Sequence, residues 1–306
     1  MPAFSAHYIF AKELADKLSA DFGFKININA VYIGAQGPDI FFFHRVFPWL
    51  KGKALRSAGS AFHRAKFGDV LDIFRTYCKN SANPEIAKSY AYGFIMHYAL
   101  DRNCHPFIYY LQNRITEKNS KLNPNSVHNT IEAALDSLLL NKHMGIDNPK
   151  AFDASYAFSC TETEKEEIAA MLSKASRIIL PLAFTKEDVK TAIEDTEYTQ
   201  HLLADKNGRR KAFIEKAEVL AFPFTKNFRI SSFLRTDDLE NAEKYVNIEN
   251  RRWKSPFESG YRTESFYDLY AQSKKDALKM ITAFENGLSG EEITHNLSFL
   301  TGVKVK

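Results

Sequence analysis

The chain has 306 residues, of which 45% are hydrophobic, enough to bury a substantial core without disulfide or metal support. Its formal charge is only +4, from 41 Lys and Arg against 37 Asp and Glu, so a nucleic-acid partner is not expected on this charge. With 13 Gly and 10 Pro, turns are few, which favours long helices and an all-α fold.

Cysteine usage and the start of the chain bear on its location. The three cysteines form no CxxC pair, so neither a disulfide framework nor a thiolate zinc site is indicated. The N-terminal residues lack the basic and apolar regions of a signal peptide. No apolar run reaches the roughly 20 residues that span a bilayer. We therefore expect a cytoplasmic protein with no transmembrane segment.

Apolar periodicity predicts helices throughout the first half of the chain. Residues 25–32 fit either a short strand or the start of a helix, and residues 34–39, which contain two glycines, are expected to form a loop. Pro106 is expected to end a helix, which places His105 at or just beyond that end. The expected helices cover residues 6–21, 60–79, 85–102 and 127–142, with one more between the last two.

The second half of the chain shows the same helical periodicity and no linker, repeat or low-complexity segment. We therefore expect a single multi-helix domain over residues 1–306. The helices expected in this half cover residues 164–180, 186–203, 209–221, 239–245 and 266–285.

Four histidines are followed by an acidic residue four positions later. On a helix this spacing puts the imidazole and the carboxylate on one face, where both reach the same metal ion. Two pairs lie in strongly apolar helices, where metal coordination would offset the cost of burying a carboxylate. The other two fall at helix ends and are expected to be solvated. The four pairs, buried ones first, are His97/Asp101, His128/Glu132, His143/Asp147 and His201/Asp205.

The two buried pairs belong to a longer ordered set of residues. The set is His7, Gly37-Pro38-Asp39, His63, His97-x3-Asp101, His105-Pro106 and His128-x3-Glu132. In this order it resembles the bacterial zinc-dependent phospholipase C family, a helical fold that zinc-dependent single-strand nucleases share. The resemblance covers residues 1–145, which would carry the metal-binding helices, while residues 146–306 would buttress them.

This resemblance implies two to three zinc ions. The first would be held by Asp39, His63, His97 and Asp101, and the second by His105, His128 and Glu132. A third would be bridged by Asp101 and completed by His7 with the N-terminal amine and carbonyl. Neutral imidazoles and carboxylates suit Zn²⁺, and clustered divalent ions acidify a bridging water and neutralise phosphate oxygens. The predicted chemistry is therefore phosphoester hydrolysis.

The expected activity is that of a phospholipase C-like phosphodiesterase using a metal-bridging hydroxide, with Asp39 also the catalytic base. Its substrate would be a phospholipid or another small phosphoester. Ile40 stands where the resemblance leads us to expect an aromatic residue beside choline, so a phosphatidylcholine preference is not predicted. The alternatives are a single-strand nuclease or phosphomonoesterase on the same fold, and a catalytically silent metal-binding scaffold.

Residues 41–50 follow Asp39 directly and are rich in aromatic side chains. They fit either hydrophobic core or an interfacial loop in which Phe47 and Trp49 make transient contact with a membrane surface. His44, within this segment, is expected to be a hydrogen-bonded core histidine or exposed.

Overall fold

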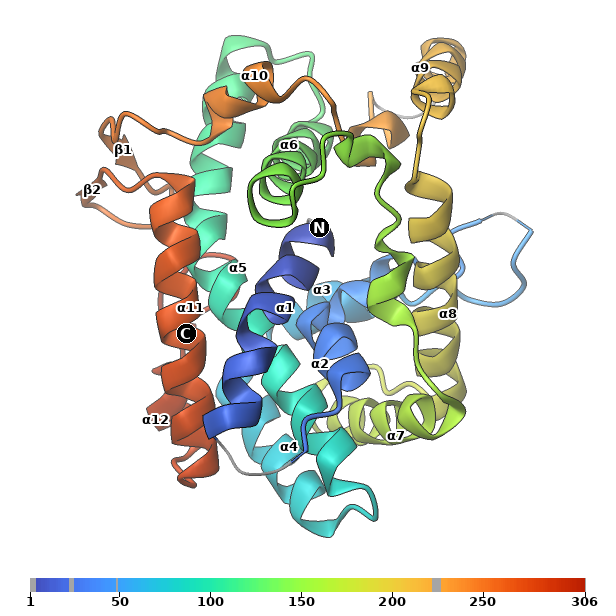
Figure 1. The fold of residues 1–306 in the computed structure, drawn as a ribbon, viewed down its shortest axis with the longest axis vertical. Helices are drawn as coiled ribbons and strands as arrows, with labels where there is room; N and C mark the ends of the chain where they lie inside the picture. Colours follow the sequence, from blue (N-terminus) through green and yellow to red (C-terminus); the bar gives the residue numbers. More distant parts are fainter. Residues whose placement is uncertain (1–3, 22–24, 48, 222–226, 306) are drawn as a thin grey trace.

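The computed structural model describes residues 4–21, 25–47, 49–221 and 227–305. Over these residues the regular secondary structure is helical apart from one short antiparallel ribbon and one isolated bridge, so the all-α expectation is confirmed (Figure 1). The first half forms α1 (Phe4–Asp21), α2 (Ile28–Ala35), the 3-10 helix η1 (Gly37–Phe42), α3 (Arg56–Arg64), α4 (Phe67–Asn80), α5 (Pro84–Lys118) and α6 (Pro124–Met144).

The second half adds shorter helices and the ribbon. Its elements are η2 (Pro149–Ala151), η3 (Ala154–Phe158), α7 (Glu162–Ile179), α8 (Lys186–Leu203), α9 (Arg209–Ala221), η4 (Ile230–Phe233), α10 (Leu239–Ala242), η5 (Glu243–Tyr245), β1 (Trp253–Lys254), β2 (Tyr261–Arg262), α11 (Phe266–Glu285) and α12 (Gly290–Thr294). In the ribbon, Trp253 pairs with Arg262 and Lys254 with Tyr261.

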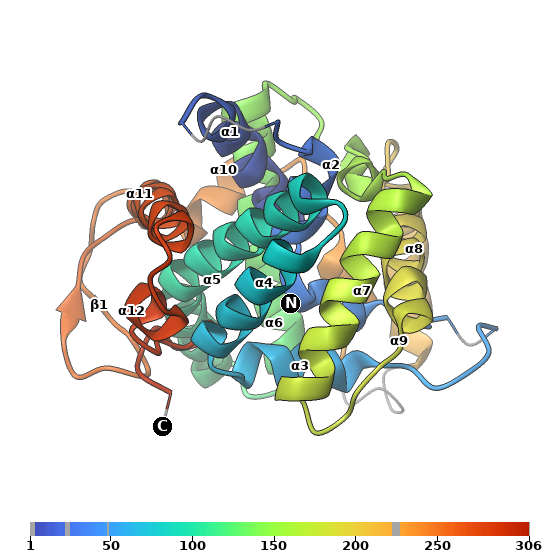
Figure 2. The same cartoon turned by 90° about the horizontal axis from the view of Figure 1, so that it is seen from below.

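Helix α5 runs through the middle of the molecule and contacts α1, α2, α4, α6, α7 and α11. Helices α7 and α8 lie on one side of it, and α11 and α12 lie on the other (Figures 1 and 2). One cluster of buried apolar side chains extends from Phe4 in α1 to Phe299 near the end of the chain. Within the described ranges, no helix is both long and apolar enough to cross a bilayer.

Helix α2 begins at Ile28, so the part of residues 25–32 with regular structure is the start of a helix and not a strand. The side chain of Asn27 accepts a hydrogen bond from the backbone amide of Ala30, so it caps α2 at its N-terminus. The expectation of a loop over residues 34–39 is also wrong for most of the segment. Gly34 and Ala35 end α2, and η1 begins at Gly37, so the chain turns at Gln36 alone.

The single helix expected over residues 60–79 is two helices. Ala65 and Lys66 are extended, with ψ angles of 155° and 111°, and they separate α3 from α4. Phe67 then packs against the rings of Phe94 and Tyr98, with centroids 5.6 and 4.3 Å away. The break therefore lets α4 bury its own apolar face, while α3 takes an independent direction.

The prediction that a helix ends at Pro106 is wrong, because α5 continues through that residue to Lys118. Cys104, Phe107 and Ile108 on either side of the proline are all buried. Tertiary packing of this apolar face outweighs the local cost of the missing hydrogen bond. His105 consequently lies inside the helix, one turn beyond Asp101.

Two glycines allow α2 and α5 to approach until their backbones touch. A Cβ atom on Gly34 would overlap the carbonyl oxygen of Tyr90, and one on Gly93 would overlap the carbonyl oxygen of Val31. Only residues without a side chain fit at both positions. This contact places the C-terminal end of α2 directly beside His97 of α5.

Candidate metal centre

The eight residues singled out in the sequence lie in one buried cluster. None is more than 6% exposed. They come from five elements, which converge because α1, η1 and α6 pack against α5 while α3 packs against η1. The residues are His7 on α1, Asp39 on η1, His63 on α3, His97, Asp101 and His105 on α5, and His128 and Glu132 on α6.

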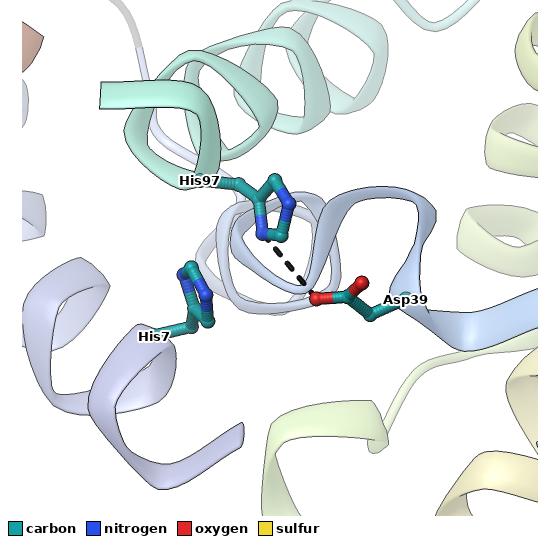
Figure 3. A group of neighbouring side chains, drawn as sticks. All are labelled: His7, Asp39 and His97. Atoms are coloured by element: carbon teal, nitrogen blue, oxygen red, sulfur yellow. Dashed lines mark ion pairs between the residues drawn. The ribbon is translucent and has the colours of Figure 1, made fainter. Parts of the chain in front are cut away.

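Three groups within this cluster have ligand atoms close enough to share one ion. In each group the three ligand atoms lie within 4.8 Å of one another. Figure 3 shows one group, in which the side chains come from three separate elements. The groups are His7/Asp39/His97, His63/His97/Asp101 and His105/His128/Glu132.

Asp101 belongs to the second group, and four imidazoles contact its carboxylate. Its Oδ1 lies 3.2 Å from Nε2 of His7. Its Oδ2 lies 3.2 Å from Nε2 of His97, 3.5 Å from Nε2 of His63 and 3.6 Å from Nδ1 of His105. A carboxylate with both oxygens surrounded in this way has the geometry of a bridging ligand.

Asp39 and His7 complete this end of the cluster. Asp39 Oδ1 lies 3.3 Å from Nε2 of His63, and its Oδ2 lies 3.8 Å from Nδ1 of His97. The ring of His7 stacks on that of His97 at 4.4 Å (Figure 3). The sequence grouped His7 with Asp101, and the structure also groups it with Asp39 and His97, with ligand atoms within 4.8 Å of one another. The N-terminal amine proposed to assist His7 lies outside the described residues.

The other end of the cluster is formed by α5 and α6. Glu132 Oε1 lies 3.1 Å from Nε2 of His128 and 3.5 Å from Nε2 of His105. The i, i+4 spacing of His128 and Glu132 puts both on one face of α6, as the sequence predicted. His105 reaches them from α5 because that helix continues through Pro106.

Four of the imidazoles are held by a hydrogen bond at Nδ1. His63 donates to the Gly59 carbonyl at 2.8 Å, His97 to Ala35 at 3.2 Å and His105 to Phe299 at 3.3 Å. The fourth, His128, donates to Oε1 of Gln112 at 2.9 Å. Each bond puts the proton on Nδ1 and leaves the Nε2 lone pair directed into the cluster.

The cluster therefore presents electron pairs to its own centre. In the described part of the chain, both oxygens of Asp39, Oδ2 of Asp101 and Nε2 of His97 are buried without a hydrogen bond. Acceptors that face one another without donors need a cation between them. Mixed imidazole and carboxylate donors at this spacing fit Zn²⁺.

The pKa shifts of His97 and Asp101 agree with a metal site, whereas that of Asp39 favours its protonated form. Burial lowers the pKa of His97 to about 3, although the Asp101 charge opposes the fall. Burial also raises the pKa of Asp39 to about 7, with Asp101 adding to the rise and His63 opposing it. For Asp101, burial acts upward, but His105 and His97 hold the pKa well below its usual range. A neutral imidazole beside an ionised carboxylate is the state that binds a metal.

Backbone geometry fixes Asp39 and His97 relative to each other. Gly37 has φ +54°, and a Cβ atom there would overlap the ring of His97. Glycine at this position thus allows the left-handed turn into η1 and leaves room for the imidazole. Asp39 follows in the first turn of η1, facing that ring.

A cavity of about 370 Å³ opens beside the cluster. Five of the eight predicted residues reach its wall, namely Asp39, His63, Asp101, His105 and His128. The rest of the wall includes Phe42, Tyr109 and Leu300, and on α3 it includes Ser60 and Arg64. The volume suits a small phosphorylated group next to the metal-binding side chains.

Two parts of the site were not identified from the sequence. Gln112 lies two turns after His105 on the same face of α5, and that spacing is a signal that could have indicated it. Phe299 packs its ring against His63 and His97, at 5.4 and 6.0 Å, while its carbonyl holds His105. Nothing local in the sequence connects it to the site.

The remaining histidines lie outside this cluster. His143 pairs with Glu13 at 2.7 Å, and His201 pairs with Asp153 at the same distance, so neither uses the acid four residues later. His44 is fully buried, and its Nδ1 accepts a hydrogen bond of 3.0 Å from the amide of Leu55. Of the two expected alternatives, the structure therefore shows the hydrogen-bonded core histidine and not the exposed one.

The aromatic segment after Asp39 divides into two parts. Phe41 and Phe43 are buried in the core, whereas Phe47 is half-buried and Trp49 is 65% exposed. Pro48 lies outside the described residues. The rings of Phe47 and Trp49 stack at 4.7 Å. This light blue loop before α3 projects away from the helices (Figures 1 and 2).

The comparisons with known proteins agree with the fold and the site. The family model of zinc dependent phospholipase C matches residues 6–186, more than half of the chain and a range that includes all eight clustered residues. The chain therefore belongs to the zinc-dependent phospholipase C family. Neither a curated protein nor a solved structure matches it.

Proposed function

We propose that this protein is a zinc-dependent phosphodiesterase of the phospholipase C type, acting on a phospholipid or a related small phosphoester. The observation that carries the proposal is the convergence of imidazole Nε2 atoms and carboxylate oxygens at the wall of one cavity. Family membership supports zinc as the metal and a phospholipid as the substrate class.

The proposed ligand sets are those that the ordered residues imply, and the set of His105, His128 and Glu132 coincides with one of the three groups in the structure. Asp39, His63, His97 and Asp101 would hold one zinc, and His105, His128 and Glu132 a second. His7 would hold a third together with Asp101. When bound, the ions would acidify a water molecule and neutralise the phosphate oxygens.

The chain's own residues would then position and deprotonate the attacking water. Asp39 lies at the cavity wall, with both oxygens free of hydrogen bonds among the described residues. It would accept the proton as the water oxygen attacks phosphorus. The bond from phosphorus to the leaving alcohol oxygen then breaks, and the same proton is available to that oxygen. Gln112 and the carbonyls of Ala35 and Gly59 keep the imidazoles from turning.

The stacked pair of half-buried Phe47 and exposed Trp49 supports a further part of the proposal, transient contact with a lipid surface. Both follow η1, which carries Asp39, so a membrane bound there would lie near the chain segment that forms the site. Arg45, Lys51 and Lys53 lie in the same loop and would favour an anionic surface.

Zinc analysis together with a substrate panel tests the proposal. Purified protein that has not met a chelator should contain two to three zinc ions. The zinc-loaded protein should hydrolyse phospholipid micelles and a soluble chromogenic phosphodiester, and should act weakly on single-stranded DNA and on phosphomonoesters. Less than one equivalent of metal would contradict the metal centre. Zinc without hydrolysis of any substrate would indicate a scaffold, and preference for DNA or a monoester would indicate one of the alternative hydrolases.

A further inference from the structure

The cavity beside the metal centre has a charged group on its rim that the proposed chemistry does not use. Arg64 is the last residue of α3, directly after His63, and its side chain is exposed at the cavity wall. Of the described residues that line the cavity, it is the only Lys or Arg. No carboxylate in the described ranges forms an ion pair with it.

A hydroxyl lies on the same face of the same helix. Ser60 precedes Arg64 by four residues, so the two side chains are neighbours on α3, and both reach the cavity. The Ser60 hydroxyl is half-buried and has no hydrogen-bond partner in the part of the chain that the structure describes. A free guanidinium with a free hydroxyl one turn away is a donor pair for an anion.

The charge balance of the cavity favours the same kind of ligand. Its lining contains two carboxylates, Asp39 and Asp101, and both face imidazoles of the cluster. Two zinc ions would outweigh these two charges and that of Glu132, and Arg64 would add one more positive charge. The described lining offers a cationic head group no unpaired carboxylate. Ile40, which stands where an aromatic residue beside choline was expected, is fully buried in the core. The cavity as a whole therefore attracts negative charge.

We propose that Arg64, assisted by Ser60, forms a subsite for a second anionic group, so that the preferred substrate is a phosphoester whose head group carries its own carboxylate or phosphate. The inference rests on the proposed function, because the scissile phosphate must sit at the metal centre next to this subsite. Arg64 is then a specificity-determining residue and takes no part in the bond cleavage.

Two matched lipid pairs test this substrate class. Phosphatidylserine differs from phosphatidylethanolamine by one carboxylate, and phosphatidylinositol 4-phosphate differs from phosphatidylinositol by one phosphate. Each would be offered at low mole fraction in neutral detergent micelles to the zinc-loaded protein. We expect kcat/KM to favour the more anionic member of at least one pair by about tenfold or more, as a charge-assisted hydrogen bond provides. The pair that responds shows which anion the subsite takes.

The variants separate the subsite from general surface charge. Arg64→Gln should reduce the preference to about threefold or less, and Arg64→Lys should keep part of it because the charge remains. Lys66→Gln is the matched control, since it removes an exposed cation two residues away that does not line the cavity. An equal loss of preference in Lys66→Gln and Arg64→Gln would overturn the subsite, as would a preference for phosphatidylcholine in the wild-type protein.

A binding measurement keeps this inference independent of turnover. By calorimetry, the zinc-loaded protein should bind O-phosphoserine about tenfold more tightly than O-phosphoethanolamine, or show the same ratio for inositol bisphosphate over inositol monophosphate. Arg64→Gln should remove that difference. Discrimination in binding without any hydrolysis would support the subsite and contradict the proposed function. Hydrolysis without discrimination, in binding or in rate, would support the function and overturn the subsite.

Discussion

Asp136 on α6 accepts a hydrogen bond of 2.8 Å from the backbone amide of Ala6, the residue before His7. Its other oxygen accepts a bond of 3.1 Å from the amide of Ser5. These amides belong to the first turn of α1, where they have no partner within the helix. Asp136 therefore caps α1 from another element, and so ties the position of His7 to the helix that carries His128.

Removing this cap should destabilise the protein. In Asp136→Ala the two amides lose their hydrogen-bond acceptor. The buried guanidinium of Arg235, which bonds to Ser5 Oγ, loses the negative charge near it. We expect the free energy of unfolding to fall by about 1–3 kcal/mol. Urea unfolding of the zinc-loaded proteins measures it, with the exposed Asp16→Ala on α1 as the control. Equal stability of the two variants would show that α1 needs no cap from α6.

Asp101 should matter more for zinc than His7 does. Its carboxylate contacts four imidazoles, whereas His7 forms its ion pair with Asp101. Elemental analysis after dialysis should show a larger loss of zinc in Asp101→Asn than in His7→Ala. His143→Ala should retain all its zinc, because that imidazole pairs with Glu13 outside the cluster. Equal losses at residues 7 and 101 would remove the bridging role of Asp101.

Asp39 should contribute more to the rate than to zinc affinity. Asp39→Asn keeps an oxygen for the metal but cannot take a proton, so kcat on a soluble chromogenic phosphodiester should fall by on the order of 10²-fold or more. Zinc content should stay nearly unchanged. Activity within about threefold of the wild type would mean that the attacking water needs no carboxylate base.

The stacked rings of Phe47 and Trp49 should matter only for aggregated substrates. Replacing Phe47 and Trp49 together by serine should lower hydrolysis of phospholipid vesicles far more than hydrolysis of a soluble phosphodiester, because only vesicles require surface binding. Phe213→Ser on α9 is a matched control, since this ring is 73% exposed elsewhere on the chain. Equal losses on vesicles and on the soluble substrate would instead mean that the loop supports the folded site.

His44 should make stability depend on pH. Burial, with the nearby charge of Arg45, lowers the pKa of this imidazole, and Asp195 and Asp188 only partly oppose the fall. The unfolded chain therefore binds a proton more readily than the folded protein does. The stability associated with neutral His44 is present above the unfolded pKa of about 6.5 and is lost as the pH falls toward the lower folded pKa.

The matched variant for this effect is His44→Gln, which can still accept the hydrogen bond from Leu55 but does not titrate. The metal-binding histidines are common to both proteins, so the difference between their profiles isolates His44. Urea unfolding between pH 8 and pH 5 should show the wild type losing stability more steeply than the variant. Parallel profiles would contradict the prediction.

Helical spacing made much of this site readable in the sequence. His97 and Asp101, like His128 and Glu132, are one turn apart on a single helix, and local geometry alone brings such pairs together. The structure gathers these pairs in one cluster with the other residues of the ordered set. Their role as ligands stays a prediction for the zinc measurements.

Local rules failed where packing between distant segments decided the outcome. Pro106 was expected to stop a helix, but the buried face around it carries α5 onward and brings His105 into the cluster. The Phe299 carbonyl reaches His105 from a segment 194 residues away. No periodicity connects such positions, because the contact depends on the path of the whole chain between them.

The contact between α2 and α5 at Gly34 and Gly93 makes the candidate metal centre sensitive to substitutions at these two glycines. A single added methyl group, as in Gly93→Ala, would separate the two backbones and withdraw the Ala35 carbonyl from His97. Without that hydrogen bond the His97 ring would be free to rotate, and its Nε2 would no longer face Asp101. A substitution at Gly93, which has no donor atom, would thus weaken the proposed metal centre. A comparison of the candidate ligands alone would overlook it.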